Sequence, residues 1–119
     1  MVFEELNKML IEKGVIEEKR VKDIKNIAFK VRNLPFLKLR DVLLTRGQIH
    51  FEDLEKQIYG ACINGGLGKR NPALLMVQLK NNFLYISIYA KEGLIKQHTS
   101  EGVLDEIRES LKNYIYEDR

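Results

Sequence analysis

Hydrophobic and polar residues alternate most regularly between Leu74 and Ala90, and this pattern predicts a β-hairpin. Asn81 and Asn82 stand at its centre, and asparagine tolerates the positive φ angles that a two-residue type I′ turn requires. The turn sets the register of one face as three aliphatic pairs, Leu79 with Leu84, Val77 with Ile86 and Leu75 with Ile88. That face is predicted to be buried.

The opposite face of the hairpin is mixed aromatic and polar, which makes it the best candidate for a contact surface. Its predicted pairs are Lys80 with Phe83, Gln78 with Tyr85, Met76 with Ser87 and Leu74 with Tyr89. The residues expected to contact a protein partner are Phe83, Tyr85, Tyr89, Lys80 and Gln78. Two alternatives stay open: helices cover the aromatic rings, or RNA bases stack on them as on an RNA-recognition motif, although the RNP1 signature of that motif is absent.

The chain before the hairpin shows helical periodicity. A first helix is predicted over residues 2–13, with Gly14 at its end. A second is predicted over residues 17–32, where apolar side chains form one stripe about 120° wide. The stripe consists of Val21, Ile24, Ile27, Ala28 and Val31. The residue before Pro35 is pushed out of the α region, which ends this helix.

Two further helices are predicted before the hairpin. One lies between Pro35 and Gly47, although residues 36–44 are also compatible with a strand. The other covers residues 51–62 and ends at the sequence Asn-Gly-Gly over residues 64–66. Its apolar positions at helical spacing are Phe51, Leu54, Ile58, Ala61 and Cys62.

The region after the hairpin completes the predicted fold. Residues 94–98 are expected to add a third short strand, and Thr99 or Ser100 to cap a last helix. The apolar face of that helix comprises Val103, Leu104, Ile107, Leu111 and Ile115. The predicted fold is one α+β domain over residues 1–119, with about four N-terminal helices, an antiparallel two- to three-stranded β-meander and a C-terminal helix packed on one sheet face. An exposed edge at residues 94–98 would also permit a homodimer.

Composition narrows the functional classes. The chain has 119 residues, a net charge of +3 and one cysteine, so it forms one domain without an internal disulfide. The N-terminus is charged and amphipathic and does not resemble a signal peptide, and the longest apolar runs are far too short to span a bilayer. The cytoplasm is therefore the expected compartment, and no membrane partner is expected.

Basic residues are concentrated in one segment, which contains nine basic and two acidic residues between Lys19 and Arg46. On the predicted helix over residues 17–32 they spread over the face opposite the apolar stripe, as Lys19, Lys22, Lys25, Lys30 and Arg32. Such a face contacts nucleic-acid phosphates, steers an acidic protein partner, or is simply solvated. The glycine-rich loop after residue 64 lacks the P-loop spacing and is either a flexible turn or an anion-binding tip carrying Lys69 and Arg70.

Catalytic and metal-binding signatures are weak. Cys62 lies on an apolar helix face, and no spacing supports a catalytic pair with His50 or His98. No cluster suits a metal, and no cofactor is expected. The sequence favours a small, cytoplasmic, non-enzymatic interaction module that binds a protein partner, as an immunity protein, antitoxin or adaptor does. The alternative is an RNA-binding module with a basic helix and an aromatic sheet face, and a second alternative is a small enzyme of unknown class.

Overall fold

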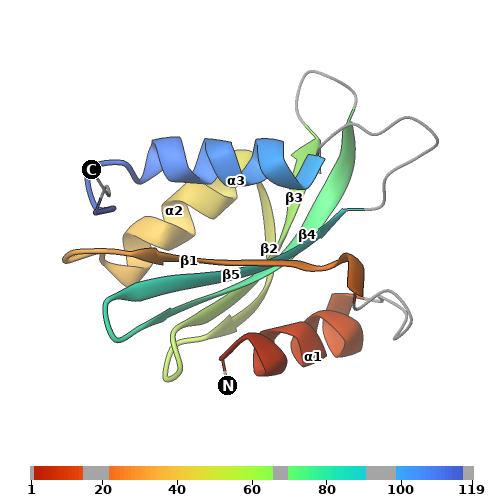
Figure 1. Cartoon of the computed structure of the whole chain (residues 1–119), viewed down its shortest axis with the longest axis horizontal. Coiled ribbons are helices and arrows are strands. Elements are labelled where there is room, and N and C mark those ends of the chain that lie inside the picture. Colours follow the sequence, from red (N-terminus) through yellow and green to blue (C-terminus); the bar gives the residue numbers. More distant parts are fainter. Residues whose placement is uncertain (1, 15–21, 66–69, 91–98, 117–119) are drawn as a thin grey trace.

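The computed structural model describes residues 2–14, 22–65, 70–90 and 99–116. These residues form three helices and one five-stranded antiparallel sheet (Figure 1). The elements are α1 (Val2–Gly14), β1 (Lys25–Lys30), α2 (Phe36–Arg46), β2 (Gly47–Asp53), β3 (Ile58–Gly65), β4 (Arg70–Lys80), β5 (Phe83–Ala90) and α3 (Thr99–Ser110). The strand order is β1-β5-β4-β3-β2, so β1 and β2 are the two edges of the sheet.

The predicted hairpin is confirmed residue by residue. Strands β4 and β5 pair in the expected register, with Leu79 opposite Leu84 and Lys80 opposite Phe83. Asn81 and Asn82 adopt φ angles of 53° and 65°, as a type I′ turn requires. The aliphatic face lies in the larger core of the molecule, as predicted.

Helices cover both faces of the sheet (Figure 1). Helices α2 and α3 lie on one face, over the larger core, to which they contribute Leu39, Leu43, Val103 and Ile107. Helix α1 lies on the opposite face, and a smaller core fills the space beneath it. The buried residues of the smaller core are Leu6, Leu10, Ile24, Ile58 and Met76. The central strands therefore carry apolar side chains on both sides.

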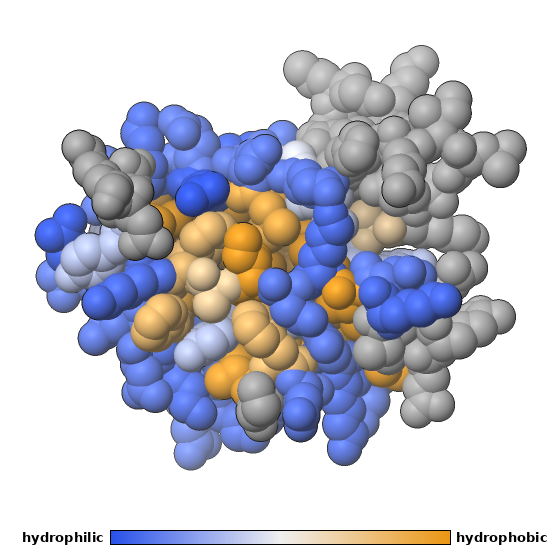
Figure 2. Space-filling model, viewed as in Figure 1, coloured by the Kyte–Doolittle hydropathy of each residue, from blue (hydrophilic) through white to orange (hydrophobic). Residues whose placement is uncertain are grey.

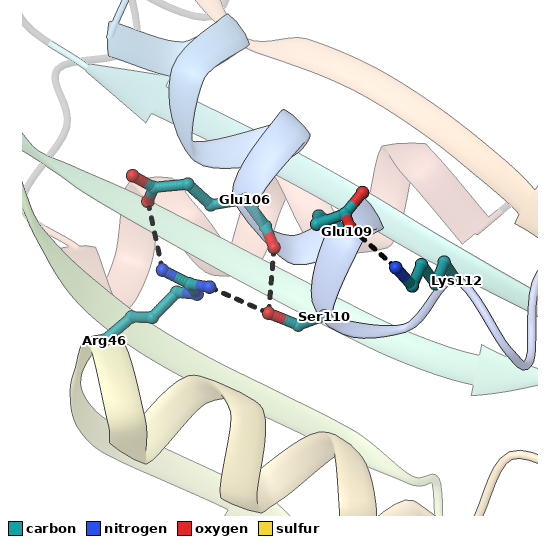
Figure 3. Close-up of polar contacts among 5 residues, drawn as sticks. All are labelled: Arg46, Glu106, Glu109, Ser110 and Lys112. Atoms are coloured by element: carbon teal, nitrogen blue, oxygen red, sulfur yellow. Dashed lines mark hydrogen bonds and ion pairs between the residues drawn. The ribbon is translucent and has the colours of Figure 1, made fainter.

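A polar contact joins the two helices above the larger core (Figure 3). Arg46, the last residue of α2, donates from Nη2 to the Ser110 hydroxyl at 2.8 Å, and its Nη1 lies 3.6 Å from a Glu106 carboxylate oxygen. The Ser110 hydroxyl in turn donates to the main-chain carbonyl of Glu106 at 2.9 Å. Glu109 pairs with Lys112 at the end of α3. The guanidinium thus connects the C-terminal ends of α2 and α3.

The predicted helix over residues 17–32 is wrong where the structure describes it, because residues 25–30 form β1. The predicted apolar stripe did not include Phe29, whose side chain packs in the larger core together with Ile27 and Val31. Because strands alternate with a period of two, these three residues share one face of the sheet. Residues 15–21 lie outside the described part of the chain.

The predicted helix over residues 51–62 is also wrong, since β2, a turn and β3 occupy this region. A bulge at His50 lies between Ile49 and Phe51, which pack on opposite sides of the sheet. The predicted helical spacing begins after this bulge and combines residues of both strands with a residue of the turn, since Leu54 is exposed between Phe51 and Ile58. Asp53 accepts a hydrogen bond from the N–H of Lys56 at 3.0 Å, and this contact closes the turn between the strands.

The remaining predictions are confirmed in part. Helices α1 and α2 lie where they were expected, and Gly47 ends α2. Helix α3 begins at Thr99 but ends at Ser110, before the last two apolar positions of the predicted face. The predicted strand over residues 94–98 lies outside the described residues. The fold is thus α+β, but the described residues form three helices and five strands instead of about four helices and a two- to three-stranded meander.

Burial of Tyr59 makes stability sensitive to alkaline pH. Its ring stacks on Phe36 with centroids 3.9 Å apart, and its hydroxyl donates to the Phe36 carbonyl at 3.2 Å. Burial raises the pKa of Tyr59 above its ordinary value of 10.0, so the folded state holds the phenolic proton more tightly than the unfolded state. The protonated phenol therefore adds to the free energy of unfolding. This added stability is fully present below the unfolded-state pKa of about 10 and is lost as pH rises through the folded-state pKa. We expect the free energy of unfolding, measured with urea, to fall less between pH 9 and 11 for Tyr59→Phe than for the wild type. An equal fall in both proteins would contradict the role assigned to Tyr59.

Candidate functional site

Part of the outer side of β1 has no pairing partner among the described residues. The N–H of Val31 donates to the Asn82 carbonyl at 2.9 Å, so the peptide groups of odd-numbered residues along β1 point toward β5. The peptide groups of Asn26, Ala28 and Lys30 therefore point away from the sheet, because this direction alternates along a strand.

The C-terminal segment covers one end of this outer side. The N–H of Tyr116 donates to the Lys30 carbonyl at 3.0 Å, and the N–H of Arg32 donates to the Tyr114 carbonyl at 2.8 Å. Earlier in β1, two N–H donors and two carbonyl acceptors point outward without a partner in the described part of the chain. We call the backbone of residues 26–28 the open edge. Such an edge is a template for an added strand.

Apolar side chains flank the open edge on both faces of the sheet. On the α3 side, Ile27 and Leu104 are half-buried at the margin of the larger core. On the α1 side, exposed Ala28 lies opposite Tyr85, whose ring contacts Phe3 edge to face with centroids 5.5 Å apart. Figure 2 shows apolar residues gathered in the middle of this view, where β1 runs between α3 and α1. An added strand would therefore bury side chains as well as pair its backbone.

Three cations and two aromatic rings gather where β1 ends. The Lys30 ammonium and the Arg32 guanidinium lie 5.2 Å and 4.9 Å from the centroid of the Tyr116 ring. Lys30 is also opposite Phe83, which is opposite Lys80 on the next strand. The two rings are 45% and 36% exposed, respectively. We call Lys30, Arg32 and Lys80 the basic cluster.

The other edge of the sheet differs from the open edge. Strand β2 carries the bulge at His50, which disrupts its regular pairing surface. Glu52 of the same strand also forms an ion pair with Arg40 of α2, whose Nε lies 2.9 Å from a Glu52 carboxylate oxygen. Bulges and charged side chains are the devices that protect edge strands from pairing. The regular backbone at residues 26–28 of β1 is therefore the better surface for strand addition.

The residues predicted to form the contact surface do not lie together on an open face. Gln78 is buried, and its amide donates to a main-chain carbonyl in the β2–β3 turn at 3.0 Å. Tyr85 and Tyr89 are half-buried against the smaller core beneath α1. Lys80 and Phe83 are exposed, next to the end of β1. Only the margin of the predicted surface is thus available to a partner.

The predicted basic residues lie around β1 instead of on one helix. Those that are exposed in the described part of the chain are Lys22, Lys25, Lys30 and Arg32. Lys25 pairs with Glu101 of α3, and of the other three Lys30 and Arg32 lie together at the end of β1. Lys19 and Lys69 lie outside the described residues, and Arg70 begins β4 opposite Gly65.

Sequence reasoning missed the residues of the open edge. Asn26 and Ala28 carry no chemical signature, and Tyr116 contributes through its position beside the cations. The alternation of Ile27, Phe29 and Val31 is the signal that could have shown β1 to be a strand.

The described residues include a pocket lined largely by amide side chains. They contain no group of three or more His, Cys, Asp or Glu side chains that could hold a metal ion. A pocket of about 280 Å³ opens at the hairpin end, with a rim of Asn33, Gln57, Asn81 and Asn82. Lys80 is the one titratable residue among its described lining residues, and amides bind ligands without transferring protons at neutral pH. The pocket therefore presents hydrogen-bonding groups.

The chain has no match among protein-family models, curated protein sequences or solved structures. No described helix is both long and apolar enough to cross a bilayer. Function therefore has to be argued from the geometry of the site.

Proposed function

We propose that this chain is a small, non-enzymatic interaction module that binds an extended segment of a protein partner along the open edge of β1. The observation that carries this proposal is the outward direction of the peptide groups of Asn26 and Ala28, between apolar side chains on both faces. Strand addition uses such groups for affinity and the alternating side chains for specificity. An adaptor, immunity protein or antitoxin of the cytoplasm would work in this way.

Energetic estimates show what the site must supply. Four backbone hydrogen bonds would contribute about 4 kcal/mol in total, at about 1 kcal/mol each. A micromolar complex requires about 8 kcal/mol after the entropic cost of association. Side chains of the partner must therefore be buried beside Ile27, Ala28 and Tyr85, where apolar burial contributes about 25 cal/mol per Å². The open edge fixes the position of a partner, and the apolar margins supply the larger share of affinity.

The direct test is Ala28→Pro, with Ala28→Val as its matched control. Proline removes the outward N–H of residue 28 and leaves the β1–β5 hydrogen bonds intact, because that N–H does not face β5. Valine keeps the N–H at the same position. We expect a protein recovered with the tagged wild type from its host, in the presence of nuclease, to be recovered about tenfold less with Ala28→Pro and equally with Ala28→Val.

Circular dichroism and thermal unfolding should show that both variants retain the fold. Equal recovery of every captured protein by the proline variant would contradict strand addition. Capture that disappears with nuclease would instead favour the RNA-binding alternative.

A further inference from the structure

We infer that the segment bound at the open edge carries an acidic side chain at the end that lies next to the basic cluster, in addition to alternating apolar residues. This inference rests on the proposed function and specifies the chemistry of the partner. The cations at the end of β1 favour an acidic side chain, and the C-terminal segment ends backbone pairing at Lys30. A second copy of this chain and RNA each satisfy only some of these groups.

The basic cluster carries charge that the described residues do not neutralise. Lys30, Arg32 and Lys80 make no ion pair with a described carboxylate. The Tyr116 ring orients Lys30 and Arg32 without cancelling their charge. Some exposed cations elsewhere do have carboxylate partners, as the pairs of Lys112 with Glu109 and Lys56 with Glu5 show.

The position of the cluster defines which part of a partner reaches it. Lys30 follows Ala28 by two residues and projects to the same face of the sheet. Its outward carbonyl is already bonded to the N–H of Tyr116, so a partner strand cannot continue its backbone pairing past this point. A side chain at the end of the paired segment can still reach the cations. A carboxylate there would face Lys30 and Arg32, whereas Lys80 lies two strand spacings further into the sheet, about 10 Å from Lys30.

A second copy of this chain fits the edge less well. Antiparallel self-pairing through the outward groups would place Asn26 of one copy opposite Ala28 of the other, with Ile27 opposite its equivalent. That arrangement uses the open backbone groups, but it places Lys30 opposite the apolar Ile24 of the other copy. An acidic segment pairs the same backbone groups and also supplies a carboxylate beside Lys30.

RNA is the other occupant that the cations would attract. Phosphates would contact the basic cluster and bases could stack on Phe83 and Tyr116, but RNA would leave the outward peptide groups of the open edge unpaired. A peptide satisfies the backbone groups and the cations together, so we favour an acidic peptide.

The test is selection from a library of random 12-residue peptides displayed on phage, against the immobilised full chain. We compare the wild type with the double variant Lys30→Glu/Arg32→Glu. The matched control is Lys8→Glu/Lys38→Glu, which changes the net charge equally at two exposed helix positions. We expect the wild type and the control to enrich alternating apolar peptides with Asp or Glu at one end, and the test variant to lose that acidic preference.

Binding of a synthetic peptide with the enriched sequence measures how much the acidic side chain contributes to affinity. Replacing its Asp or Glu by the amide should weaken binding to the wild type about tenfold and change binding to Lys30→Glu/Arg32→Glu much less. Affinity for the wild type should also fall more steeply between 50 and 500 mM salt than affinity for that variant, because exposed charges are screened.

The outcomes separate this inference from the proposed function. Peptides that lose binding with Ala28→Pro but show no acidic preference would overturn the inference and leave strand addition standing. Peptides that bind Ala28→Pro equally, or no enrichment of any peptide, would overturn both. A light-scattering mass of twice 13.9 kDa that Ala28→Pro reduces to one chain would assign the edge to a second copy. Binding of a fluorescent oligouridylate through Lys30 and Arg32, without competition by selected peptides, would assign the cluster to RNA.

Discussion

Replacing Leu10 with alanine will lower the free energy of unfolding by about 3 kcal/mol, measured by urea unfolding followed by circular dichroism. Leu10 is fully buried where α1 packs on the sheet, in the smaller core with Leu6 and Met76. Truncation removes apolar contacts and leaves a cavity that the sheet beneath it cannot close, because the central strands are fixed by pairing on both sides.

The matched control is Leu37→Ala, which removes the same atoms from a side chain of α2 that is 66% exposed. We expect this change to lie within about 0.5 kcal/mol of the wild type. An equally small effect of Leu10→Ala would mean that α1 does not hold the sheet, and that Tyr85 and Tyr89 lie on an open aromatic face, as the sequence had suggested.

The hairpin could be predicted because its determinants are local. Two asparagines fix the turn, the turn fixes the register, and alternation identifies the buried face over residues 74–90. The same reasoning did not predict that α1 covers the second face. Met76 and Ser87 are both fully buried there, so a mixed composition on that face does not indicate exposure. Which helix covers a sheet depends on contacts between distant residues, which periodicity does not show.

The strands β1, β2 and β3 were interpreted as helices for a physical reason. Short apolar runs match a period of 3.6 as well as a period of two, most of all in a strand such as β3 that carries apolar residues on both faces. Ile24 and Ile27 illustrate this, since they belong to cores on opposite sides of the sheet. The bulge at His50 adds a further break in the alternation.

The candidate site was predicted in part. Lys30, Arg32, Lys80 and Phe83 were named from the sequence and do lie near one another, but at the end of a sheet. The open edge could not be predicted, because the peptide groups that stay unpaired are decided by strand order and by the C-terminal segment bonded to Lys30. Residue types indicate where charge and aromatic rings gather, whereas unpaired backbone emerges only from topology.

Replacing Gly47 with alanine should also cost about 3 kcal/mol of unfolding free energy, because the added Cβ meets backbone atoms. Gly47 joins α2 to β2, and a Cβ built there lies 2.1 Å from the Cys62 carbonyl oxygen and 2.9 Å from the Ile63 Cα. Strand β3 pairs with β2 and β4, so these atoms cannot withdraw without breaking hydrogen bonds. The smaller backbone entropy of alanine would favour the variant by up to about 1 kcal/mol, which does not offset the clash.

Gly60→Ala is the control that separates a backbone clash from a side-chain clash. The nearest atom to a Cβ at residue 60 is the Met76 sulfur at 2.7 Å, and a flexible thioether can move aside. We expect a cost of about 1 kcal/mol for Gly60→Ala, measured in the same urea titrations. If Gly47→Ala were no more destabilising than Gly60→Ala, the close approach between the end of α2 and β3 would be absent in solution. The pairing of β2 with β3, which fixes one side of the sheet, would then need a different register.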